Sequence, residues 1–78
     1  MVNIGELIHE KVAEKGLSVT LLAKRLNCSR TNVYKIFDRR TIDTGTLFRI
    51  SIALGFDFFG ILSRELQSRI TTTPNDKK

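Results

Sequence analysis

Lysine and arginine side chains are concentrated in one short stretch of this 78-residue chain. Six of them lie between positions 24 and 40, where the only acid is Asp38. Residues 1–23, in contrast, carry two lysines against three glutamates. A surface that faces phosphates needs such a local excess of positive charge. The stretch therefore favours a nucleic-acid partner more strongly than the net charge of +5 does by itself.

Side chains that could read DNA bases fall on one predicted helix, residues 30–37. The positions that this helix leaves outward, in its first turn and one turn later on the same side, are Arg30, Thr31, Tyr34 and Lys35. Arginine can pair bidentately with O6 and N7 of guanine, which is worth about 1–3 kcal/mol of discrimination. Lysine reaches the same acceptors less selectively, and a threonine methyl suits the thymine methyl. Arg39 and Arg40 follow in a polar loop, where we expect them to contact phosphates.

Each of these residues also has an interpretation without DNA. Arg30 and Lys35 would then belong to a solvated helix face, and the two loop arginines would serve only solubility. The ring of Tyr34 would pack on the surface of the protein instead of touching a sugar or a phosphate. The local excess of positive charge and the helical context described below favour the DNA interpretation.

The sequence offers no support for catalysis. It has no Gly-rich phosphate loop, no nucleophile paired with a base and no carboxylate pair with a plausible pocket. His9 has no second ligand at metal-binding spacing, so we expect no metal site. The single cysteine, Cys28, is interpreted as a small core residue. We therefore expect no enzyme activity, no cofactor and no small-molecule ligand.

Five short helices must position the basic stretch, because apolar residues recur every three to four positions and no strand alternation persists. The first helix runs from the N-cap Asn3 to about Gly16, and the others span about 19–26, 30–37, 44–54 and 58–67. In the last helix we expect an inner face of Phe58, Ile61 or Leu62, and Leu66. We assign residues 1–70 to one domain and residues 71–78 to a flexible polar tail.

The second and third predicted helices have the features of a helix-turn-helix. Ala23 lies where the two helices must approach closely, since a larger side chain would push them apart. Asn27 occupies the turn position that needs a left-handed backbone, and Ser29 can cap the third helix. The apolar side chains expected to fix the crossing angle are Leu22, Leu26, Cys28, Val33 and Ile36.

On these residues the chain resembles Cro/phage-repressor-type, or lambda-repressor-like, helix-turn-helix regulators. The family's fourth helix reads Leu-Leu-Lys-Ile-Ala-x-x-Leu-Gly, and residues 47–55 here read Leu-Phe-Arg-Ile-Ser-Ile-Ala-Leu-Gly. The resemblance covers about residues 4–62. It implies an all-α five-helix bundle whose third helix enters the major groove of duplex DNA, often as a homodimer on a two-fold operator.

The resemblance also assigns roles to individual positions. The residues that match the family's base-reading positions are Ser29, Arg30, Thr31 and Lys35. The residues that match positions touching the DNA backbone are Tyr34, Arg39 and Arg40. Thr20 is expected to substitute imperfectly for a further phosphate contact, which the family makes with a glutamine that this chain lacks. That contact is missing because Val19 stands where the family's second helix starts with glutamine. Asn27 replaces the usual turn glycine, which costs little.

Taken together, these features predict a sequence-specific transcription regulator, a repressor in the leading interpretation. We expect it to be cytoplasmic, because no segment looks like a signal peptide or a membrane span. A homodimer, an antitoxin-like autoregulator and a protein-interaction module remain open. The module would use apolar residues at positions that the family leaves polar, Leu21, Ile52 and Phe59. Non-specific or RNA binding by charge alone is a third alternative.

Overall fold

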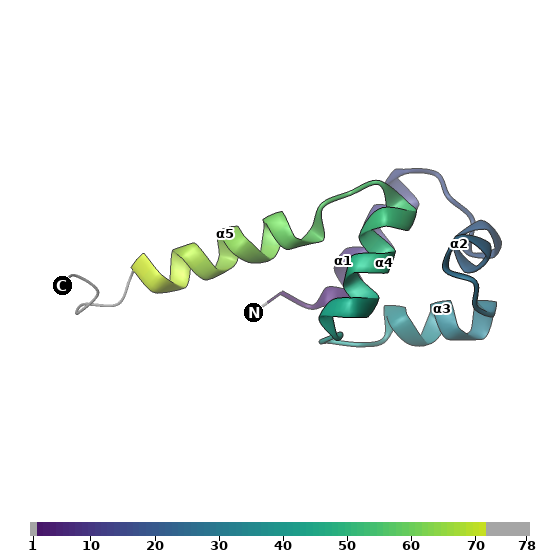
Figure 1. Ribbon diagram of the computed structural model, residues 1–78, viewed down its shortest axis with the longest axis horizontal. Coiled ribbons are helices and arrows are strands. Elements are labelled where there is room, and N and C mark those ends of the chain that lie inside the picture. The colour runs from purple at the N-terminus through teal and green to yellow at the C-terminus, as the bar shows by residue number, and fades with distance from the viewer. Residues whose placement is uncertain (1, 72–78) are drawn as a thin grey trace.

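A computed structural model describes residues 2–71 of the chain. It consists of five helices and, within those residues, contains no strand (Figure 1). Their bounds are α1 Ile4–Glu14, α2 Val19–Leu26, α3 Arg30–Phe37, α4 Thr44–Leu54 and α5 Phe58–Thr71. The predicted all-α architecture of five helices is confirmed for the described residues, and the predicted starts of the helices agree with the observed ones to within one residue.

Side-chain caps fix where α1 to α4 begin. In each case an oxygen of the residue before the helix accepts a hydrogen bond from the backbone N–H three positions on, which satisfies one of the donors that a helix start leaves unpaired. The capping residues are Asn3, Ser18, Ser29 and Asp43. Three left-handed residues, Gly16, Asn27 and Gly55, turn the chain after α1, α2 and α4. Local sequence thus determines the element boundaries.

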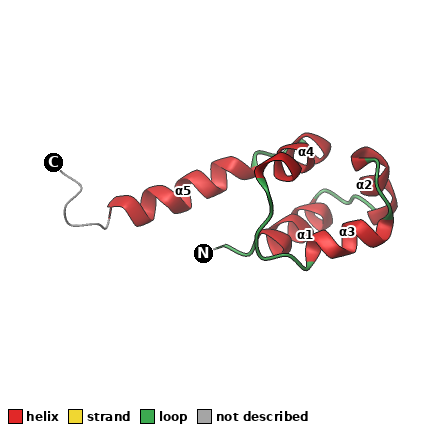
Figure 2. Ribbon diagram, turned by 60° about the horizontal axis from the view of Figure 1, so that its bottom comes forward, coloured by secondary structure: helices red, strands yellow, loops and turns green. Residues whose placement is uncertain are grey.

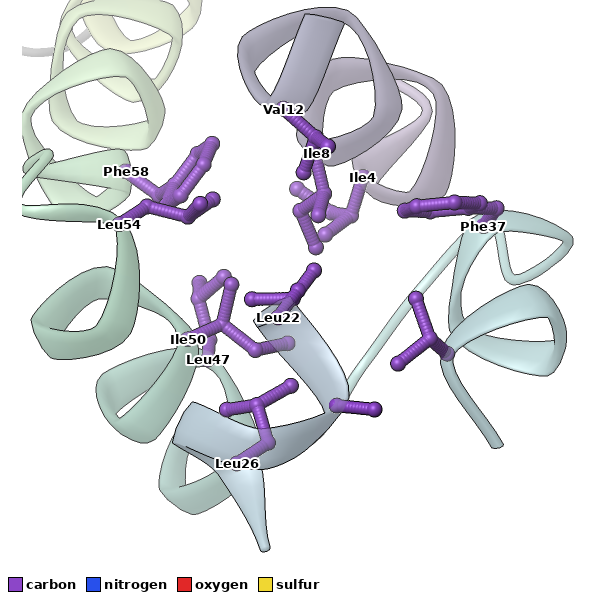
Figure 3. Packing of buried hydrophobic residues seen from close by; sticks show 12 residues of the cluster. Ile4, Ile8, Val12, Leu22, Leu26, Phe37, Leu47, Ile50, Leu54 and Phe58 are labelled. Atoms are coloured by element: carbon purple, nitrogen blue, oxygen red, sulfur yellow. The ribbon is translucent and has the colours of Figure 1, made fainter. Parts of the chain in front are cut away.

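A single core joins α1 to α4 and the first residue of α5 (Figure 3). Its most enclosed side chains have less than 2% of their surface exposed, and they are Phe58, Ile8, Leu22, Leu47, Ile50 and Val33. They come from all five helices. Because every helix contributes at least one such anchor, burial of apolar surface sets the relative placement of α1 to α4.

The fifth helix differs from its predicted packing. Phe58 is buried and Leu62 packs against the core, but Leu66 is 56% exposed. The prediction that Leu66 belongs to the inner face is therefore wrong. After Gly55 ends α4, the connection directs α5 away from the other helices, so only its first two turns can reach the core (Figures 1 and 2).

The end of α5 also lies further along the chain than the sequence predicts. The helix continues to Thr71, so the first residue of the predicted tail is helical. The rest of that tail, residues 72–78, lies outside the described residues. No helix in residues 2–71 combines the length and the apolar character that crossing a bilayer requires.

Candidate nucleic-acid interface

The turn between α2 and α3 has the backbone geometry that the sequence predicts. Asn27 adopts φ 57° and ψ 47°, in the left-handed region. Its backbone N–H donates to the carbonyl of Lys24 at 3.1 Å, and the N–H of Cys28 donates to the carbonyl of Ala23 at 2.9 Å. The hydroxyl of Ser29 then accepts from the N–H of Asn32 at 3.1 Å and starts α3. Three consecutive residues thus end one helix and begin the next.

Close packing holds α3 at a fixed angle to α2. Ala23 is buried between the helices, as predicted, and Leu22 and Leu26 of α2 share the core with Val33 of α3. Cys28 and Ile36 are half-buried against the same core. Because α2 and α3 have eight residues each, too few for stability in isolation, this packing is what keeps α3 in place.

The opposite end of α3 is fixed by α1. The backbone N–H of Gly5 donates to the carbonyl of Arg39 at 2.7 Å, and the N–H of Ile4 donates to that of Arg40 at 3.1 Å. A Cβ at Gly5 would lie only 2.3 to 2.7 Å from the carbonyl oxygens of Phe37, Arg39 and Ile36. Glycine is therefore required for this approach. No local pattern in the sequence assigns a role to Gly5, because only the fold brings residue 5 beside residues 36–40.

Aromatic contacts add to the fixation of α3 on α1. The imidazole of His9 stacks on the ring of Phe37, with centroids 4.3 Å apart. Tyr34 meets the same ring edge-on, at 6.1 Å between centroids. Tyr34 nevertheless remains 56% exposed. The structure thus combines the two interpretations of Tyr34, since its ring packs on Phe37 while much of its surface faces solvent.

All eight residues predicted to contact DNA are exposed in the structure. Four of them, Arg30, Thr31, Tyr34 and Lys35, are exposed positions of α3, whereas Val33 and Phe37 of the same helix are buried. Ser29 lies just before the helix with its hydroxyl engaged as the cap. An outward, cation-bearing surface on a helix braced at both ends therefore exists where the sequence placed it.

A groove beside α3 brings together residues that are distant in the sequence. It has a volume of about 260 Å³ and lies between α3, the following loop and α4. Lys35 and Arg39 line it together with Asn32, Thr46 and Arg49. Asn32 was not among the candidates predicted from the sequence. Asparagine nevertheless pairs well with adenine, and the position lies three residues before Lys35, on a neighbouring part of the helix surface. Arg49 and Thr46 could not be placed there without the fold.

The remaining predicted contacts lie apart from this groove. Arg40 is exposed, and its carbonyl is tied to α1 as described above. Thr20 is exposed in the first turn of α2 and does not line this groove. It also does not line a second groove, which lies between α1 and α3 beside His9 and Tyr34. Val19, which stands in place of the family's glutamine, packs its side chain against the core. The structure thus gathers Lys35 and Arg39 but leaves Thr20 separate.

Two arginines serve the fold through reciprocal contacts between α2 and α4. The guanidinium of Arg25 donates to the carbonyl of Ala53 at 2.9 Å, near the end of α4. The guanidinium of Arg49 donates to the carbonyl of Leu26 at 2.6 Å, at the end of α2. Each arginine places its charge at the negative end of the other helix. Arg25, one of the six cations of the basic stretch, is therefore held by α4.

Asp43 is the acid in the groove beside α3. The backbone N–H of Thr46 donates to its carboxylate at 2.9 Å and the hydroxyl of Thr46 donates at 2.7 Å. These bonds hold the pKa of Asp43 below its ordinary value, and the charge of Arg39 acts in the same direction. The carboxylate is therefore ionised at neutral pH, and its role in the fold is to cap α4.

Metal ligands are not clustered in the described part of the chain: residues 2–71 contain no group of three or more His, Cys, Asp or Glu side chains that could hold an ion. The ring of His9 is instead stacked on Phe37.

Comparison with known protein families matches residues 3–67 to the Cro/C1-type HTH DNA-binding domain. The chain belongs to this family. The match covers most of the chain and includes the turn at Asn27, the exposed surface of α3 and most of α5. A search of curated proteins and a search of solved structures each found no match. As a Cro/C1-type domain, the protein is a DNA-binding regulator with DNA as a partner.

Proposed function

We propose that this Cro/C1-type domain binds duplex DNA sequence-specifically and represses transcription by occupying an operator. The observation that carries the proposal is the outward surface of α3, where Arg30, Thr31 and Lys35 are exposed on a helix braced by α2 at one end and by α1 at the other. A rigid support is needed because base recognition depends on donors and acceptors placed to within fractions of an ångström.

Within this proposal the residues divide into two groups. Ser29, Arg30, Thr31 and Lys35 read base edges in the major groove, with Asn32 as a further candidate on the flank of the helix. The residues that position the protein on the sugar-phosphate backbone are Thr20, Tyr34, Arg39 and Arg40. Neither task requires a catalytic group, and two copies would bind an operator with two-fold symmetry.

Selection of bound duplexes from a random pool tests the proposal most directly. We expect a defined consensus made of two inverted half-sites about one helical turn apart. The same selection with Arg30→Ala should relax one base position in each half-site. A pool that stays random with the wild-type protein, at salt concentrations where binding is measurable, would contradict sequence-specific recognition.

The salt dependence of binding gives a second, independent measure. A handful of phosphate contacts, at about 0.9 per contact, predicts a log–log slope of roughly −4 or steeper. Arg40→Ala should make the slope shallower by about 1, whereas Arg64→Ala, an exposed cation on α5, should leave the slope unchanged.

A second candidate function rests on exposed apolar side chains outside α3. Leu21 is 37% and Ile52 is 68% exposed, and Phe59 is half-buried. Such residues would suit a protein-interaction module or an antitoxin-like regulator bound to another protein. A flat salt slope together with a random selected pool would favour this function over DNA recognition.

A further inference from the structure

The two arginines that join α2 and α4 make bonds of the same kind in different surroundings. Arg49 donates to the carbonyl of Leu26 at 2.6 Å, and Arg25 donates to the carbonyl of Ala53 at 2.9 Å. Each guanidinium satisfies a carbonyl near the end of a helix. Only Arg49, however, lines the groove beside α3. The pair therefore allows a contribution to stability, which both arginines can make, to be separated from an effect on the groove.

The bond of Arg49 lies where α2 passes into the turn. Leu26 is the last residue of α2, and the left-handed Asn27 follows it directly. Arg49 belongs to the second turn of α4. The bond thus ties α4 to the end of α2, and α3 begins only a short turn later, at Arg30. A shift of this end of α2 is passed on to α3, because the turn and the shared core join the two helices.

The groove beside α3 has α3 on one side and α4 on the other. Asn32 and Lys35 line it from α3, and Thr46 and Arg49 line it from α4. Its width depends on how α3 is placed relative to α4. Since α3 is packed on α2, and Arg49 holds the end of α2 on α4, the bond to Leu26 helps to set that width.

The charges in the groove act on Lys35 as well. The other two cations that line it are Arg39 and Arg49, and the only acid among the lining residues is Asp43. The carboxylate of Asp43 accepts hydrogen bonds from the N–H and the hydroxyl of Thr46. Because like charges repel, the ammonium group of Lys35 is favoured outside the groove, toward solvent.

We propose that Arg49 is a positioning residue for base recognition by Lys35. Its bond to Leu26 sets the placement of α3 relative to α4, and its charge directs the lysine out of the groove. Base recognition needs donors placed to within about 0.5 Å. Loss of Arg49 therefore weakens the preference at the base that Lys35 reads. The inference rests on the proposed function, because it requires that α3 reads bases.

Selection of bound duplexes from a random pool tests this role. Arg49→Met removes the charge and the donors but keeps an unbranched apolar chain, and we expect it to relax the base position that Lys35→Ala also relaxes. Arg25→Met is the matched control, since it removes the reciprocal bond away from the groove, and it should leave the selected consensus unchanged. Arg49→Lys should recover most of the preference, because lysine keeps the charge and can donate to Leu26.

A double-mutant cycle measures the size of the effect. Fluorescence anisotropy compares the preferred duplex with a duplex altered at the base that Lys35 reads. Arg49→Met should lower the discrimination between the two duplexes by about tenfold. In a Lys35→Ala background the same change should have no further effect on discrimination, because Arg49 acts through the lysine. Arg25→Met should keep the wild-type discrimination.

Three results would overturn the positioning role. The first is an unchanged consensus for Arg49→Met. The second is an equal loss for Arg49→Met and Arg25→Met on every duplex, which would indicate a purely structural bond. The third is a shallower salt slope with an unchanged base preference, which would make Arg49 a direct phosphate contact.

Controls keep these outcomes separate from unfolding and from a failure of the proposed function. Circular dichroism shows whether each variant is folded at the temperature of the assay. If Arg49→Met is not, Arg49→Gln takes its place, since glutamine keeps a donor but no charge, and it should relax the base position that Arg49→Lys preserves. A random pool with the wild-type protein would contradict the proposed function. A defined wild-type consensus that the folded Arg49 variants leave unchanged would contradict only the role of Arg49.

Discussion

The helical body, α1 to α4, and the projecting helix α5 use the same kinds of residues in different ways. In the body, each helix buries an apolar face against other helices, and Leu22 and Val33 are almost fully enclosed, although Phe48 and Ile52 on the outer side of α4 are exposed. In α5, a comparable apolar face continues past Leu62 into solvent. Both regions are helical because of local spacing and caps, yet in α5 only the first part of the apolar face, from Phe58 to Leu62, packs against the core.

This difference separates two tasks. Recognition of bases needs side chains at fixed positions, and α3 is held by α2, by α1 and by the loop that Gly5 contacts. The second candidate function would need apolar surface that is open to another molecule, and exposed apolar side chains lie on α5, at Leu66 and Ile70, and on α4, at Phe48 and Ile52. The body therefore presents a rigid polar surface, while α5 presents an apolar one.

The largest predicted effect contrasts one leucine from each region. Leu22→Ala should lower the free energy of unfolding by about 2–5 kcal/mol, because it leaves a cavity in the core. Leu66→Ala should change it by less than about 0.5 kcal/mol in dilute protein. Denaturant unfolding followed by circular dichroism measures both. An equal loss for the two variants in dilute protein would contradict the contrast between body and projecting helix.

The second effect concerns the close approach of α1 to the end of α3. Gly5→Ala should destabilise the protein by about 3 kcal/mol, because the new Cβ must displace backbone carbonyls instead of flexible side chains. Gly45→Ala is the control, since a Cβ there meets nothing closer than 3.4 Å and alanine favours a helix. Thermal unfolding of both variants measures the difference. A melting temperature of Gly5→Ala equal to that of the wild type would contradict this account.

The third effect lies in the affinity for DNA. Arg30→Ala should cost about 1–3 kcal/mol on the preferred duplex and much less on a duplex altered at the base that Arg30 reads. Arg40→Ala should weaken both duplexes alike, because a phosphate contact carries no sequence information. Fluorescence anisotropy titrations at one fixed salt concentration measure the four affinities. Equal losses for Arg30→Ala on both duplexes would show that Arg30 does not read a base.

The smallest predicted effect is a dependence of the protein's stability on pH below neutrality. The pKa of Asp43 is lowered in the folded protein by its bonds with Thr46, so the ionised carboxylate stabilises the fold above the ordinary pKa of an aspartate. That contribution is lost as the pH falls through the lowered value. Between neutral pH and about pH 2, the melting temperature should therefore fall less in Asp43→Asn than in the wild type. The same fall in both proteins would show that this cap does not contribute.

Much of the fold could be predicted from local sequence. The caps Asn3, Ser18, Ser29 and Asp43 predicted where α1 to α4 begin, because a side chain three residues from an N–H can satisfy it without any distant partner. Asn27 predicted the turn for a similar reason, since only a few residue types adopt a left-handed backbone at low cost. The exposed positions of α3 followed from its apolar spacing.

The sequence did not predict the features that depend on distant neighbours. Leu66 fits the spacing of an inner face, but spacing cannot tell whether a helix continues along the core or leaves it. Gly5 has no local signal, because its neighbours lie more than thirty positions later in the chain. The same holds for Arg25 and Arg49, since each donates to a carbonyl near the end of a helix that lies far away in the sequence.

By itself, then, the sequence determined which segments are helical, where they start and which side chains α3 turns outward, because short-range hydrogen bonds and helical period decide these features. The tertiary structure alone decided that α5 leaves the body, that Lys35 shares a groove with Arg49, and that Leu66 is exposed. Those outcomes depend on the direction of each connection and on the volume that the packed side chains fill, and neither can be read from residues close in the sequence.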